Sequence, residues 1–123
     1  MMTGAVSAAL ETMLPLSVQG PGGQPQPIDA VVDTGFNGFL TLPPALIASL
    51  GLPWISSIQA TLADGSSQQL DVDAVRVLWE GQPRTVDVQA VDAPVLIGMK
   101  LLQGSELRIE VVAGGAVTIT AIP

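Results

Sequence analysis

Hydrophobic and polar side chains alternate along most of this chain, with the period of two that is typical of a strand buried on one face. The alternation is clearest over residues 58–62, 75–79, 86–90, 107–111 and 117–121. Turn-forming residues lie between these runs, at positions 20–23, 64–65, 81–83 and 114–115. The pattern predicts a mainly β domain of antiparallel strands.

Two short helices are expected between the strands. Pro43 and Pro44 open a predicted helix over residues 45–50, because proline suits the first helical turn and a glycine follows the last. Residues 99–103, again followed by glycine, predict a second helix of one turn. The sequence contains no repeat and no linker, so residues 1–123 are expected to form a single domain.

Composition excludes several classes of partner. The chain is 48% hydrophobic and 12% charged, with a formal net charge of -7. Nucleic acid is not an expected partner, because phosphate binding needs clustered bases and the four present are scattered over residues 76–108. Residues 34–63 carry no charge, but prolines and glycines interrupt them, so neither a membrane-spanning helix nor a membrane partner is expected. The low charge content favours an oligomer.

The chain contains no histidine and no cysteine. Ser-His-Asp triads, Cys-His dyads, histidine-ligated zinc and disulfide bonds are therefore excluded. Any catalysis must use carboxylates, hydroxyls or backbone groups. Residues 1–13 lack a positively charged segment and carry Glu11, so no secretory signal is expected and a cytoplasmic location is predicted.

The most informative motif is Asp33-Thr34-Gly35, which follows the apolar run Ile28–Val32. A carboxylate at the end of a core strand loses solvation unless hydrogen bonds or a function compensate. Glycine at this point allows a tight turn and a close approach of backbones. An ordinary turn, in which Asp33 or Thr34 caps its own backbone, also explains the motif.

The order of further motifs adds a family resemblance. A second apolar run ends in Leu96-Ile97-Gly98, and a long hairpin turning at Asp64-Gly65 lies between it and Asp33. This order resembles the retropepsin-like aspartic proteases, and DTGFNGFLTLP at residues 33–43 looks like their bacterial and cyanobacterial single-domain branch. The resemblance covers Ile28–Ile119 and implies an acid-protease barrel of antiparallel strands with one or two short helices.

The resemblance also implies roles for individual residues. Asp33 would be catalytic, the Thr34 hydroxyl would hold two active-site loops together, and Gly35 would let these loops approach. The residues expected to contact substrate are Phe36, the flap-tip residues Ala63, Asp64, Gly65 and Ser66, and the downstream Leu96, Ile97 and Gly98, which also support the catalytic loop. A routine hairpin turn at residues 64–65 and core packing of Leu96 and Ile97 are the ordinary alternatives. Phe36 departs from the small residue usual in retroviral and pepsin-like members.

Chemistry of this family needs two aspartates, and this chain has one Asp-Thr-Gly and no room for two lobes. The resemblance therefore implies a homodimer that hydrolyses a polypeptide through an aspartate-activated water, without metal or cofactor. Residues 116–122 could interleave with the partner or form an internal strand. Two alternatives stay open: an inactive peptide-binding module on the same fold, and an unrelated β interaction domain. Trp54 and Trp79 are expected in the core, although either could line a substrate pocket.

Overall fold

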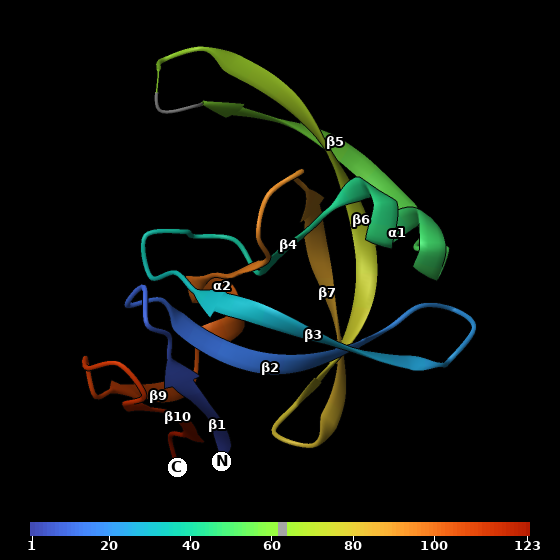
Figure 1. Ribbon diagram of the computed structural model, residues 1–123. Helices are drawn as coiled ribbons and strands as arrows, with labels where there is room; N and C mark the ends of the chain where they lie inside the picture. The colour runs from blue at the N-terminus through green and yellow to red at the C-terminus, as the bar shows by residue number, and fades with distance from the viewer. Residues whose placement is uncertain (62–63) are drawn as a thin grey trace.

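The computed structural model describes residues 1–61 and 64–123. Its strands are β1 (Met2–Val6), β2 (Thr12–Gln19), β3 (Pro25–Val32), β4 (Leu40–Leu42), β5 (Trp54–Thr61), β6 (Ser67–Trp79), β7 (Gln82–Ala90), β8 (Leu96–Ile97), β9 (Ser105–Ile109) and β10 (Ala116–Ala121). Its helices are α1 (Pro44–Leu50) and α2 (Met99–Leu102). Figure 1 shows α1 and α2 as short insertions beside the strands.

In the described part of the chain, all the strands belong to one sheet, in the order β5-β6-β7-β4-β8-β3-β2-β1-β10-β9. β6 also pairs with β2, which brings the sheet back on itself in a barrel-like arrangement that is not strictly closed. β3 runs parallel to β8 and β4 runs parallel to β7, whereas the remaining pairings are antiparallel. The predicted mainly β fold with short helices is confirmed, with these parallel pairings as an addition.

The core lies inside the curved sheet and follows the predicted alternation. In β6, Val75, Val77 and Trp79 are buried, while Arg76 between them is exposed. β1 and β2 are not among the predicted strands, although β2 shows the same alternation of buried residues. The run predicted to reach residue 111 ends earlier: β9 stops at residue 109, and Val111 is 68% exposed because the chain turns there.

The helices confirm the sequence expectations closely. α1 begins at Pro44, and Gly51 ends it with a left-handed φ of 63°, a conformation that glycine adopts without strain. α2 ends at Leu102, one residue earlier than predicted, and buries Leu101 and Leu102 against the sheet. Among the described residues, no helix has the length and hydrophobicity to span a membrane.

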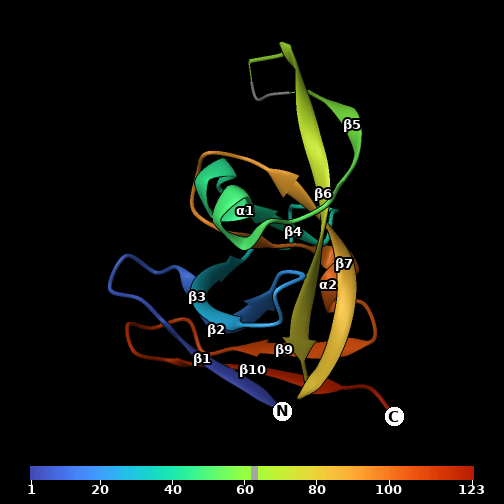
Figure 2. The same ribbon diagram turned by 90° about the vertical axis from the view of Figure 1, so that its right-hand side faces the viewer.

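β5 and the first half of β6 form a long hairpin, the flap hairpin, which projects from the body of the domain (Figures 1 and 2). Most of β5 is exposed, and only the second half of β6 enters the core. Trp54 lies at the base of this hairpin beside a β-bulge and is 61% exposed, so its predicted place in the core is wrong. Trp79 is 7% exposed, as predicted.

Candidate active site

Asp33 is the first residue after β3, a strand held inside the sheet by neighbours on both sides. β3 pairs with β8 so that Val32 lies opposite Ile97. The Asp33 N–H donates a hydrogen bond to the Ile97 carbonyl oxygen at 2.9 Å, and Val31 makes the equivalent bond to Val95 at 2.8 Å. The two apolar motifs singled out in the sequence therefore lie side by side.

The Asp33 carboxylate forms a local turn with the residues that follow it. The Gly35 N–H donates to Asp33 Oδ1 at 2.9 Å, and the Phe36 N–H donates to the Asp33 carbonyl oxygen at 3.1 Å. This is the Asx turn considered as the ordinary explanation of the motif. It also fixes the orientation of the half-buried carboxylate by engaging Oδ1, whereas no hydrogen bond between described residues engages Oδ2.

The loop after Asp33 is held against the start of α2 by backbone hydrogen bonds. Three consecutive N–H groups of residues 98–100 donate to carbonyl oxygens of residues 36–39. The bonds are Gly98 N–H to Phe39 at 3.0 Å, Met99 N–H to Phe36 at 2.8 Å and Lys100 N–H to Gly38 at 3.1 Å. The catalytic loop is thus bound along its length to the segment after β8.

Phe36 packs within this junction. A side chain at Gly98 would overlap the Gly38 carbonyl oxygen and place a Cβ 2.7 Å from the Phe36 ring. A Cβ at Gly38 would lie 2.5 Å from another ring atom. The aromatic ring therefore occupies space that two glycines leave free, and the half-buried Phe36 contributes to loop packing. Its predicted contact with substrate stays a prediction.

The downstream motif supports the loop from behind. Ile97 is fully buried and Gly98 is also buried, so the expectation that these two contact substrate is corrected: their surfaces face the core and the 36–39 loop. Leu96 is half-buried, and its N–H donates to the Thr41 hydroxyl at 2.9 Å. Thr41 is a buried residue of β4 that the sequence did not single out, because its role depends on the pairing of β4 with β8.

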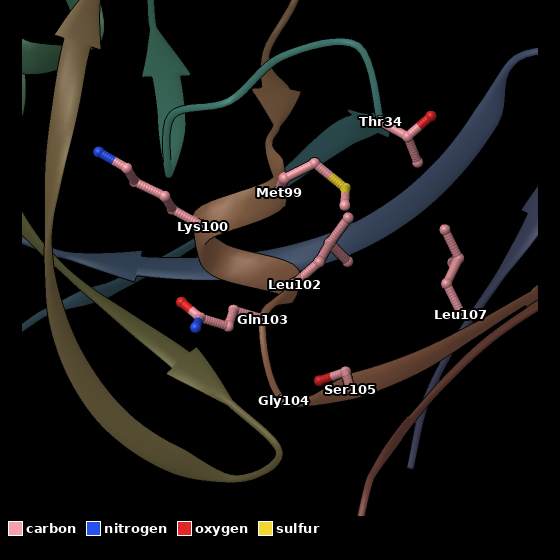
Figure 3. A pocket seen from close by; sticks show the side chains of 8 residues that line it. All are labelled: Thr34, Met99, Lys100, Leu102, Gln103, Gly104, Ser105 and Leu107. Atoms are coloured by element: carbon pink, nitrogen blue, oxygen red, sulfur yellow. The ribbon is translucent and has the colours of Figure 1, made fainter.

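Thr34 is exposed and lines a pocket of about 510 Å³ beside the catalytic loop. Figure 3 shows Met99 and Leu102 of α2 and Leu107 of β9 pointing into the same space as Thr34, while Lys100 and Gln103 point to the other side of α2. Gly104 and Ser105 complete the lining. Sequence reasoning missed this pocket, which exists because α2 and β9 converge on the Asp33 loop.

The flap tip is an exposed tight turn. Gly65 has a φ of 85°, and Asp64 Oδ1 accepts hydrogen bonds from the Ser66 N–H at 2.9 Å and the Ser66 hydroxyl at 2.6 Å. These bonds, with that from the hydroxyl first, lower the pKa of Asp64 below its usual value. Ala63 lies outside the described residues. The tip stands well apart from the Asp33 loop (Figures 1 and 2), so the predicted flap residues do not contact Asp33 within one chain.

A second acidic pair lies at the base of the flap hairpin. Asp73 of β6 is 5% exposed, and its burial, together with the neighbouring charge of Asp71, raises its pKa. Asp71 accepts a hydrogen bond from the Trp54 indole at 3.2 Å. Over residues 1–61 and 64–123, no three acidic side chains come together in a group able to hold a metal ion.

The fold of this chain is that of retroviral proteases. It superposes on the solution structure of simian foamy virus (mac) protease with a TM-score of 0.51 and 20% identity, over 72% of this chain and 90% of that one. It superposes on EIAV protease, solved in complex with an inhibitor, with a TM-score of 0.51 and 18% identity, over 76% of this chain and 86% of that one. No protein-family model and no curated protein sequence matches the chain. The structural comparisons therefore establish a retropepsin-like fold.

Proposed function

We propose that this protein is an aspartic endopeptidase in which two identical chains each contribute Asp33. The observation that carries the proposal is the placement of Asp33. It follows a core strand, its backbone is bonded to Ile97, and one carboxylate oxygen is fixed by Gly35 while the other is free of hydrogen bonds to described residues. The fold shared with retroviral proteases supports the same reading.

The requirement for a second chain follows from acid–base chemistry. Peptide hydrolysis by carboxylates needs one group to take a proton from water and another to donate a hydrogen bond to the scissile carbonyl. The described residues place no second carboxylate against Asp33, and the chain has one Asp-Thr-Gly motif. Two Asp33 side chains that face each other would share one proton, because ionising both at short range is costly.

The reaction then proceeds without a covalent enzyme intermediate. The ionised Asp33 accepts a proton from a bound water, and the water oxygen forms a bond to the carbonyl carbon. The protonated Asp33 of the other chain donates a hydrogen bond to the carbonyl oxygen as negative charge develops there. When the tetrahedral intermediate collapses, the C–N bond breaks and the leaving nitrogen takes a proton from the carboxyl pair, which returns the dyad to its singly protonated state.

The proposed substrate is an extended polypeptide held beneath the flap hairpin. Residues 64–66 of the flap tip are exposed and available to contact it. A net charge of -7 on each chain disfavours acidic peptides by electrostatic repulsion. We further propose that the chain belongs to the bacterial single-domain branch, which the sequence DTGFNGFLTLP supports. The cytoplasmic location stays a prediction.

A second candidate function is peptide binding without cleavage. β5 is the last strand at one end of the sheet, and most of its residues are exposed. Such an edge can pair with an extended peptide through main-chain hydrogen bonds. This function would require neither Asp33 nor a second chain.

The test is cleavage of a diverse peptide library, read by mass spectrometry, with the Asp33→Asn variant in parallel. Asp29→Asn is the matched control, because Asp29 is an exposed residue of the same strand. We expect cleavage by the wild type and by Asp29→Asn, with a loss of about 1,000-fold or more in Asp33→Asn. Equal cleavage by all three proteins would contradict the proposal, and binding without cleavage by all three would favour the second candidate.

A further inference from the structure

β10, the strand nearest the C-terminus of the chain, has no free edge. Its residues 116–119 pair with β1, and its residues 117–121 pair with β9 on the opposite side, in both cases antiparallel. Of the two possibilities left open by the sequence, the structure therefore shows an internal strand. A second chain cannot insert a strand beside β10 without breaking one of these ladders.

β9, in contrast, is an edge strand. It ends the sheet order, and within the described residues it pairs with β10 alone. The hydrogen bonds from Glu110 N–H to Ala116 and from Ile122 N–H to Gly104 set the phase of the β9–β10 ladder. By the alternation of antiparallel pairs, the N–H and carbonyl groups of residues 105, 107 and 109 then point away from β10, toward the free edge.

The two faces of β9 differ in character. The side chains of Ser105, Leu107 and Ile109 are half-buried, whereas those of residues 106, 108 and 110 are charged and exposed. The first face borders the pocket that Thr34, Met99, Leu102 and Leu107 line (Figure 3). An unpaired strand edge and an apolar groove therefore lie next to each other and next to the catalytic loop.

We propose that a second copy of this chain binds along the β9 edge and this groove, with the two β9 strands antiparallel across a two-fold axis. The proposal rests on the proposed function, because a single Asp33 leaves the active site incomplete. Thr34 lines the groove and is adjacent to Asp33 in the chain, so a copy seated there brings its own Asp33 toward the first. A two-fold axis makes the same surface serve both chains.

The groove can be tested by placing a charge in it. Met99 and Ile55 are both 47% exposed, but Met99 lines the groove while Ile55 lies on β5 at the base of the flap hairpin. We expect sedimentation equilibrium to show dimers for the wild type and Ile55→Glu. Met99→Glu should dimerise about 100-fold more weakly, because its carboxylate would be buried without a partner. Circular dichroism should show the same fold in all three.

A cross-linking experiment tests the strand pairing itself. Because the chain contains no cysteine, a single introduced cysteine gives a clean background. Antiparallel pairing about a two-fold axis places one β9 residue opposite its own copy. A cysteine placed in turn at each of residues 105–109 should therefore give a disulfide-linked dimer on oxidation at one or more positions. Ile55→Cys, as the control, should give none.

The outcomes separate this proposal from the proposed function. A Met99→Glu dimer as tight as the wild type, a wild type that is monomeric, or a dimer that no cysteine in β9 cross-links would overturn the β9 interface. If Asp33-dependent cleavage persisted in such a dimer, the protease would stand with another interface. A dimer linked through β9 that shows no Asp33-dependent cleavage would support the interface and overturn the proposed function.

Discussion

The Asp33 N–H donates a hydrogen bond to the Ile97 carbonyl oxygen over 2.9 Å. This bond joins the ends of two parallel strands, β3 and β8, that are far apart in the sequence. Because Ile97 is fully buried, the core itself sets the position of the Asp33 backbone. The Asx turn with Gly35 then orients the carboxylate. The placement of the candidate catalytic group is therefore a consequence of folding, which makes several of its supports testable by stability measurements.

Replacing Gly98 should loosen the catalytic loop. In Gly98→Ala the new methyl group would meet the Phe36 ring and the Gly38 carbonyl oxygen, so the loop must shift. We expect the free energy of unfolding to fall by about 1–3 kcal/mol, the range for overpacking a filled site. Urea denaturation measures this. Gly22→Ala is the control, because its Cβ would meet no atom within 4 Å, and a similar loss in both variants would contradict the packing argument.

The buried hydroxyl of Thr41 should matter for the strand behind the site. It accepts the Leu96 N–H at 2.9 Å, so Thr41→Val leaves that donor without a partner. We expect Thr41→Val to reduce the free energy of unfolding by about 1–3 kcal/mol. Thr41→Ser keeps the hydroxyl and should lose less. If the serine variant were as unstable as the valine variant, the methyl group rather than the hydrogen bond would be responsible.

Much of this fold follows from local sequence patterns. Strict alternation in β6, β7 and β10 predicted these strands, and proline and glycine marked α1 correctly. β2 was missed although its buried residues alternate. It contains Pro15, which usually argues against a strand, but Pro15 is exposed and pairs only with Asp29 of β3. The missed strand thus reflects tertiary context that a local pattern does not contain.

The candidate site was predictable only in part. Asp33 and the Leu96-Ile97 run were recognisable because a carboxylate rarely follows an apolar strand without a reason. The pocket between α2 and β9 depends on how Thr34 and Leu107 meet in space, which no spacing along the chain indicates. Trp54 was expected in the core, but it lies at a bulge where its indole bonds to the exposed Asp71.

Asp73 should make stability depend on pH. Burial, and then the charge of Asp71, raise the pKa of Asp73 above its usual 3.8. The folded protein therefore holds this proton more tightly than the unfolded chain. The resulting contribution to stability is complete below about pH 3.8 and is lost as the pH rises through the higher folded-state pKa.

The Asp73→Asn variant tests this dependence, because it keeps the shape of the side chain without the charge. We expect its melting temperature to exceed that of the wild type at pH 7 and to match it at pH 3. Asp87→Asn, at an exposed position of β7, should change little at either pH. A gain for Asp73→Asn that is the same at both pH values would mean that its charge is not the cause.

Cleavage itself should be fastest at acidic to mildly acidic pH. The proposed mechanism needs one ionised and one protonated Asp33, a state that disappears when both carboxyls have lost their protons. A profile of kcat/KM against pH should therefore be bell-shaped, with its descending limb at or below neutrality. A rate that continues to rise above neutral pH would be inconsistent with a shared proton.

The central claim is that one active site contains Asp33 from two chains, and a mixing experiment tests it most directly. Wild type at fixed concentration is equilibrated with increasing amounts of Asp33→Asn, and peptide cleavage is measured. At equal amounts, random pairing leaves about half of the wild-type chains in fully wild-type dimers. We predict that activity falls to about that fraction and approaches zero with excess variant. Activity that stays constant throughout the titration would show that a single chain carries a complete site and would contradict the account.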